Sequence, residues 1–194
     1  MLNLITVGFN HTYLKELHKS ILKKDDIVWY VITNNENTNY PDFLSRTPNI
    51  HWLNCSEPTD FSNFNNRINR LFELVYEEDP QGHFQIIDED TLYLPNSYEI
   101  YRRYKDYRGL IIGNQLYYND TLRLKSCIPR EAFIDSGNCL CSTEVLKYIR
   151  WGSMDNPSPD FKFWDKCYKY FNNKAIILDE SISYYNAQKF QLEG

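Results

Sequence analysis

Three acidic residues, Asp88-Glu89-Asp90, directly follow a short apolar run at 84–87. The run is bounded by Gly82-His83 and by charge, which predicts a buried inner strand of a sheet. Side chains alternate along an extended backbone, so we expect Asp88 and Asp90 on one side and Glu89 on the other. Two carboxylates at a strand's end suit Mn²⁺ or Mg²⁺ and chemistry in which a phosphate leaves. A charged turn without a metal is the alternative.

The composition indicates one globular domain with a sizeable core. The chain has 194 residues, 42% of them hydrophobic and 24% charged. Aromatic residues make up 16%, including 16 tyrosines, as in a domain with an aromatic-lined groove and in many ordinary folds. The net charge of −5 argues against nucleic acid as the main partner.

The sequence shows no targeting or membrane signal. No stretch approaches the roughly 18 apolar residues of a membrane span, and the N-terminus lacks the basic start of a signal peptide. The five cysteines are scattered, which favours reduced thiols and a cytoplasmic location. Cys139 and Cys141 have no second pair or nearby histidine to complete a zinc site, so we expect them in the core.

The first half alternates strands with helices. Strands are expected at 2–9, 27–32 and 49–53, and helices at 13–22 and from Asp60 or Ser62 onward. Asn10-His11-Thr12 is typical of a turn and helix cap. The nearly continuous apolar run at 27–32 predicts a parallel strand covered on both faces. The long helix carries one apolar stripe, made of Phe61, Phe64, Ile68, Leu71, Phe72 and Val75.

The second half mixes short strands and helices. Helices are expected at 97–105, at 143–151 after a Ser142 cap and from Asp160 onward, and strands at 84–87, 109–118 and 175–178. The other segments are a polar connection at 119–130, a segment at 132–141 with the apolar pair Phe133-Ile134 before D-S-G-N, and a mobile loop at 152–159. Together the elements predict an α/β fold, a single domain (1–194) whose central mixed, mostly parallel sheet is flanked by helices.

Ligands of open α/β sheets bind outside the carboxyl ends of the strands. Gly8-Phe9-Asn10, Thr33-Asn34-Asn35 and the acid triplet all fall there. The first two clusters could read a base and ribose, while the triplet, Glu89 included, holds a metal-bound pyrophosphate. Arg67 is the side chain expected to reach a phosphate. For Arg67 and Arg70 the alternative is a solvated helix face.

These features resemble the GT-A glycosyltransferases. A parallel α/β half, an Asn66-Arg67 step on a helix and a buried strand ending in D-x-D match the order in that family. The D-S-G-N segment at 135–138 resembles its acceptor-side segment, and P-D-F-K-F-W-D at 159–165 resembles its acidic helix start. Length and order are similar to the small glycosyltransferases of large algal (chlorella) viruses, which act in the host cytoplasm and use UDP-sugars.

The resemblance implies a GT-A-like (Rossmann-like) fold with a nucleotide-binding half (1–96) and an acceptor-side half (97–194). It implies transfer from a UDP-glucose-like donor to a glycan or glycoprotein hydroxyl, with a slight preference for retention of the anomeric configuration. Asp90 would be the direct ligand of Mn²⁺ or Mg²⁺, bridging both phosphates, and Asp88 would lie near the ribose and the metal.

The resemblance also assigns the acceptor side. Asp135, a candidate catalytic residue, and the Gly137 backbone would face the transferred sugar or the acceptor, with Gly137 allowing close approach. Gly137 and Asn138 would also contribute to binding of the donor. Asp160, or else Asp165, is the candidate catalytic carboxylate near the anomeric centre; a simple helix N-cap is the alternative for Asp160.

One departure from the family pattern concerns the metal. Many members add a metal-binding histidine near the C-terminus, and the four histidines here are His11, His18, His51 and His83. Asn186 or water would take that place, and the metal would bind well only together with the nucleotide.

Other functions remain open. A haloacid-dehalogenase-type phosphatase would use Asp88 in D-x-D-x-T, but Thr91 here follows Asp90 directly. A nucleotidyltransferase would need a Gly-rich loop after the first strand, which Gly8-Phe9-Asn10 is not. A non-enzymatic carbohydrate-binding module would bind glycan without metal or nucleotide.

Overall fold

The computed structural model describes residues 1–34, 42–55, 61–152 and 158–185, with the side chains of 34, 55 and 61–63 excepted. The strands are β1 (Leu2–Val7), β2 (Ile27–Asn34), β3 (Ile50–Cys55), β4 (His83–Ile86), β5 (Leu110–Tyr117), β6 (Leu122–Leu124), β7 (Cys139–Ser142) and β8 (Ala175–Tyr185). The helices are α1 (His11–Ser20), α2 (Phe43–Arg46), α3 (Phe61–Glu78), α4 (Pro95–Tyr104) and α5 (Pro159–Tyr170), with 3₁₀ turns η1 (Ser136–Asn138) and η2 (Thr143–Lys147).

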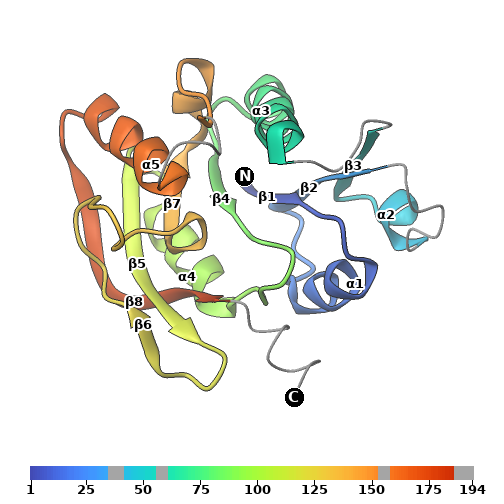
Figure 1. The fold of residues 1–194 in the computed structure, drawn as a ribbon, viewed down its shortest axis with the longest axis horizontal. Helices are drawn as coiled ribbons and strands as arrows, with labels where there is room; N and C mark the ends of the chain where they lie inside the picture. The colour runs from blue at the N-terminus through green and yellow to red at the C-terminus, as the bar shows by residue number, and fades with distance from the viewer. Residues whose placement is uncertain (35–41, 56–60, 153–157, 186–194) are drawn as a thin grey trace.

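Within these residues eight strands form one sheet in the order β3-β2-β1-β4-β7-β5-β6, with β8 paired to β5 (Figure 1). The pairs among β3, β2, β1 and β4 are parallel, as is β5 with β8. Only β6 and β7 run against their neighbours. The predicted α/β class with a mixed, mostly parallel sheet is confirmed. Because β7 opposes β4, the segment entering β7 lies at the edge where β1 and β4 end.

Helices cover both faces of the sheet. On one face α3, α5 and η2 pack against the strands, and the rings of Phe72 and Phe163 lie 5.2 Å apart between centroids. On the other face α1 and α4 contribute Leu14, Leu17 and Ile100. Strand β2 alternates between the two cores, as its continuous apolar run predicts.

The expected cap of the first helix is confirmed. The Asn10 side-chain oxygen accepts from the backbone N–H groups of Thr12 (3.0 Å) and Tyr13 (3.3 Å). Cys139 and Cys141 are fully buried in the core, also as predicted. None of the helices in the described part is long and apolar enough to cross a membrane.

Several elements differ from their sequence predictions. The helix predicted at 143–151 is only the 3₁₀ turn η2. The Thr143 hydroxyl donates to the Asp79 carbonyl, just after α3, at 2.6 Å, and this contact ties the start of the turn to the end of that helix. Strand β8 runs well past residue 178, since β5 pairs with it as far as Tyr185. Strand β6 lies in the expected polar connection. Residues 153–157 of the expected mobile loop lie outside the described residues.

Candidate active site

The acid triplet lies in a turn. Strand β4 ends at Ile86, and the Thr91 N–H donates to the Asp88 carbonyl at 3.1 Å. The alternation that was to place Asp88 and Asp90 on one side therefore does not apply, because the backbone is no longer extended there. The two carboxylates nevertheless interact, since Asp90 contributes to raising the pKa of Asp88.

Glu89 joins two loops at the carboxyl edge of the sheet. Its Oε2 accepts from the backbone N–H groups of Phe9 (2.5 Å) and Asn10 (2.7 Å), which follow β1. Loss of hydration raises the pKa of Glu89, and these two hydrogen bonds oppose that rise. Glu89 thus fixes the loop that precedes α1 against the loop that precedes α4.

Arg67 does not belong to a solvated helix face. It is only 3% exposed, and its guanidinium carbon lies 5.1 Å from the centre of the Phe9 ring. Arg70 fits the solvated alternative, since it is exposed and pairs with Glu73 at 3.1 Å. Asn66 is exposed beside Arg67. Strand β2 ends at Asn34, whose side chain lies outside the described residues.

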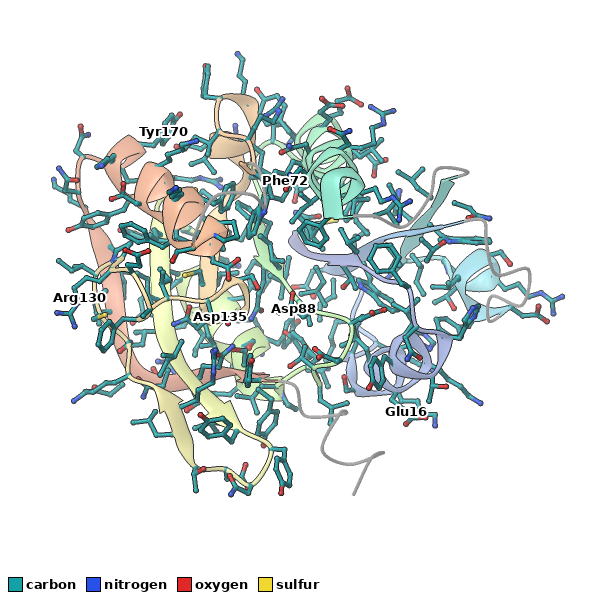
Figure 2. All side chains as sticks on the ribbon, in the orientation of Figure 1. Glu16, Phe72, Asp88, Arg130, Asp135 and Tyr170 are labelled. Atoms are coloured by element: carbon teal, nitrogen blue, oxygen red, sulfur yellow. The ribbon has the colours of Figure 1, made fainter. Side chains whose placement is uncertain are left out.

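The segment that enters β7 lies beside the acid triplet. The Ser136 hydroxyl donates to Asp88 Oδ2 at 3.2 Å, and Figure 2 shows Asp88 and Asp135 together near the centre of the molecule. The Asp135 carboxylate accepts from the Gly137 N–H (3.1 Å), Gln115 Nε2 (3.0 Å) and Arg123 Nη1 (3.0 Å). The Asp135 carboxylate therefore accepts from three donors within the protein, and these hydrogen bonds fix the turn.

Gly137 and Asn138 shape this turn from inside. Asn138 is fully buried; its amide oxygen accepts from the Asp135 N–H (3.1 Å), and its Nδ2 donates to the Gly113 carbonyl (3.2 Å). A Cβ at Gly137 would lie 3.2 Å from Ser183 Oγ. The close approach that a glycine permits here is thus to β8.

Asp160 lies in the first turn of α5, and the N-cap position belongs to Ser158. The capping alternative for Asp160 is therefore wrong. Burial first, and then the Asp135 carboxylate, raise the pKa of Asp160 to about 7, while Arg123 lowers it. Asp165, the second candidate, pairs with Lys169 at 2.7 Å.

The site carries an excess of negative charge. Loss of hydration raises the pKa of Asp88 well above its usual range, followed in effect by Asp135, Asp160 and Asp90, while the Ser136 hydroxyl lowers it. The Asp88 side chain remains accessible to solvent, so repulsion from the neighbouring carboxylates is the main reason for the raised pKa. Of these carboxylates, Asp135 has an ion pair with Arg123.

The donor chemistry fits a hard divalent cation held by few protein ligands. Carboxylate oxygens with raised pKa values gain from a nearby cation. Among the described residues, however, no group of three or more His, Cys, Asp and Glu side chains is placed to hold a metal ion. Asp88 and Asp90 would therefore need oxygens from a bound ligand or water to complete the coordination. Asn186, the suggested further ligand, lies outside the described residues.

Sequence reasoning missed Arg123. It lies on β6, where its guanidinium carbon is 3.5 Å from the centre of the Tyr185 ring while its Nη1 pairs with Asp135. The alternation Leu122-Arg123-Leu124 was the local signal for a short strand. Its pairing with a carboxylate could not be read from that pattern.

Comparison with known structures gives clear fold neighbours. S. aureus TarS 1-349 in complex with UDP-GlcNAc matches with a TM-score of 0.69 and 15% identity, over 95% of this chain and 58% of that one. Its complex with UDP matches with 0.68 and 15%, over 95% and 60%. A putative glucose-1-phosphate thymidylyltransferase from Bacillus anthracis matches with 0.51 and 13%, over 94% and 88%.

No protein-family model and no curated protein matches this chain. The chain spans about three fifths of TarS 1-349 and 36% of the longer TarS chain that it also matches. At these identities the likeness concerns the fold. The chain therefore has an α/β fold of the GT-A-like type, which it shares with TarS of S. aureus, a protein solved with UDP and UDP-GlcNAc bound.

Proposed function

We propose that this chain is a metal-dependent glycosyltransferase that moves a sugar from a UDP-sugar to a hydroxyl of a glycan or glycoprotein. The observation that carries the proposal is the gathering of Asp90, Asp135 and Asp160 within electrostatic range of Asp88, where β1 and β4 end. Ligands of this architecture bind at that edge. The likeness to TarS, which binds UDP-GlcNAc, supports a nucleotide-sugar as the donor.

Asp88 and Asp90 would hold the divalent cation together with oxygens of the diphosphate. Bound there, Mn²⁺ or Mg²⁺ would neutralise the leaving nucleoside diphosphate. Phe9, Asn10 and Asn34 would line the nucleotide. Arg67, whose guanidinium lies against the Phe9 ring, would pair with a phosphate. Asp135 would act as a positioning residue, since its carboxylate is already occupied by Gly137, Gln115 and Arg123.

Asp160 would be the general base. A carboxyl with a pKa of about 7 is ionised often enough at neutral pH to accept a proton and basic enough to hold it. The acceptor hydroxyl would pass its proton to Asp160, and its oxygen would form the new bond to the anomeric carbon. The bond from that carbon to the phosphate oxygen breaks, and UDP leaves with the electron pair.

A general base at Asp160 favours a single displacement with inversion of the anomeric configuration. The resemblance to the GT-A family alone slightly favours retention. A general base takes the proton of the acceptor hydroxyl while the oxygen of that hydroxyl attacks the anomeric carbon directly. The expected product has the anomeric configuration opposite to that of the donor.

Calorimetric titration with UDP tests the proposal. Wild-type protein should bind UDP at least tenfold more tightly with Mn²⁺ than with EDTA, because the metal links the diphosphate to Asp88 and Asp90. Asp90→Asn should lose this dependence, and Asp106→Asn, which removes an exposed carboxylate elsewhere, should keep it. If Asp90→Asn retained the full Mn²⁺ effect, the assignment of Asp90 would fall.

The same titration separates the alternatives. A phosphatase would bind simple phosphate analogues in preference to UDP, and a carbohydrate-binding module would respond to neither UDP nor Mn²⁺. The phosphatase fold also normally places its nucleophile after the first strand of the chain, whereas Asp88 follows the fourth.

A further inference from the structure

Two exposed tyrosines lie side by side away from the carboxylates. Tyr148, just after η2, is 63% exposed, and Tyr170, the last residue of α5, is 39% exposed. Their ring centroids are 5.9 Å apart and their planes differ by 25°. Figure 2 shows Tyr170 at the periphery, whereas Asp88 and Asp135 lie near the middle. Scattered apolar residues on a surface are ordinary, but two exposed rings in contact place a compact aromatic pair on this surface.

Positively charged side chains lie around this tyrosine pair. A shallow, wide-open depression of about 530 Å³ on the surface is lined by Tyr148, Ile149, Arg150, Lys166, Lys169 and Tyr170. The Lys147 ammonium adds a fourth positive charge, 5.3 Å from the centre of the Tyr148 ring. Two carboxylates offset part of this charge: Asp165 pairs with Lys169 at 2.7 Å, and Glu144 lies within electrostatic range of Tyr170. The patch is therefore locally basic on a chain whose net charge is −5.

We propose that this tyrosine–lysine patch binds an acidic oligosaccharide, and that this oligosaccharide is the distal part of the acceptor. The inference rests on the proposed glycosyl transfer for its role, though the binding itself does not need it. Aromatic faces pack against the apolar face of a sugar ring, and lysine and arginine pair with its carboxylate or phosphate groups. Both kinds of contact are present at this depression.

Helix α5 connects the patch to the proposed chemistry. Asp160 lies in its first turn and Tyr170 at its last residue, so the two are separated by about 15 Å along the helix axis. An acceptor chain of a few sugar units could reach both. A single-stranded nucleic acid would use similar contacts, but the overall negative charge disfavours it.

The test is the binding of tetragalacturonate to the full chain, measured by calorimetry in EDTA without nucleotide. Wild-type protein should bind it at least tenfold more tightly than neutral maltotetraose, and rising salt should weaken the binding. Tyr148→Ala and Lys166→Glu should each reduce the affinity at least fivefold. Their controls are Tyr118→Ala, another exposed tyrosine, and Lys105→Glu, the same charge reversal on a distant exposed lysine.

Several outcomes would overturn the proposal: equal affinity for the two tetramers, equal losses in patch and control variants, or tighter binding of an octathymidylate. UDP affinity measured in parallel should be unchanged in all four variants. If wild-type protein bound tetragalacturonate but not UDP with Mn²⁺, the patch would stand and the proposed function would fail. If it bound UDP but not tetragalacturonate, only the patch would fail.

Discussion

At the scale of single residues, the ionisation of Asp160 matters most to the proposed reaction. The first turn of a helix favours a carboxylate through the helix dipole, yet burial and the neighbouring Asp135 outweigh that effect and bring the pKa to about 7. Below that pH Asp160 is mostly protonated and is too weak a base to take the acceptor proton. Above it the carboxylate is available.

Asp160→Asn should therefore reduce sugar transfer by at least a hundredfold while leaving UDP affinity within about twofold. Wild-type turnover should fall as the pH is lowered through the pKa of Asp160, which is about 7 without metal and lower with the cation bound, and the residual activity of the variant should lack that dependence. Transfer to an acceptor, followed by product chromatography across pH 5.5–8.5, measures both. Equal losses in transfer and in UDP affinity would mean that Asp160 only supports the helix.

At the scale of elements, the loops that follow β1 and β4 are held together by one side chain. The Glu89 carboxylate accepts from two backbone N–H groups, at Phe9 and Asn10, and Phe9 in turn contacts Arg67. Charge-assisted hydrogen bonds of this kind contribute more than neutral ones, and two unpaired N–H groups are costly. The loop that we assign to the nucleotide thus depends on the acid triplet for its position.

Glu89→Ala should lower the free energy of unfolding by about 2 kcal/mol and weaken UDP binding, because both N–H groups lose their acceptor. Glu89→Gln should recover part of both, since its amide oxygen can still accept. Urea denaturation and UDP calorimetry measure these effects. Glu99→Ala, which removes one member of an exposed ion pair with Arg102, is the control and should change little. Indistinguishable results for Glu89→Ala and Glu99→Ala would exclude the loop-holding role.

Elements with a strong local pattern could be predicted from the sequence. The apolar stripe of α3 indicates which face of the helix is buried, and the continuous apolar run of β2 indicates that both faces of the strand are buried. Strand β8 could not be predicted to its full length, because its polar middle is stabilised by contacts with other elements. For example, Asn114 Nδ2 donates to the Asp179 carbonyl at 2.6 Å. Such a contact depends on tertiary structure and leaves no local pattern.

The candidate site also has residues that could be predicted from the sequence and contacts that could not. Asp88 was found from its place at the end of an expected strand, and Asp135 and Asp160 from the resemblance to the GT-A glycosyltransferases. The structure brings the three within electrostatic range. The interactions of Glu89 with Phe9 and of Arg123 with Asp135 were not predicted, because the partners are 80 and 12 residues apart in the chain. The turn at Asp88 also escaped prediction, since an acidic triplet fits a strand end and a turn equally well.

At the scale of the whole molecule, the sheet gathers its carboxylates at one edge. Strands β1 and β4 end there, and the antiparallel β7 begins there, so acidic side chains from distant parts of the sequence meet. The same sheet carries α5, whose two ends bear the proposed base and the tyrosine–lysine patch. Donor chemistry and acceptor binding would thus be supported by one scaffold whose fold is shared with TarS.

A crystal grown with UDP and Mn²⁺ and measured at the manganese absorption edge tests the central claim most directly. We expect one anomalous peak about 2 Å from a carboxylate oxygen of Asp88 or Asp90 and from oxygens of the UDP diphosphate. Crystals of Asp90→Asn under the same conditions should lack that peak. Well-defined UDP with no manganese near Asp88 or Asp90, or UDP bound away from the carboxyl edge of the sheet, would contradict the proposed metal-dependent transfer.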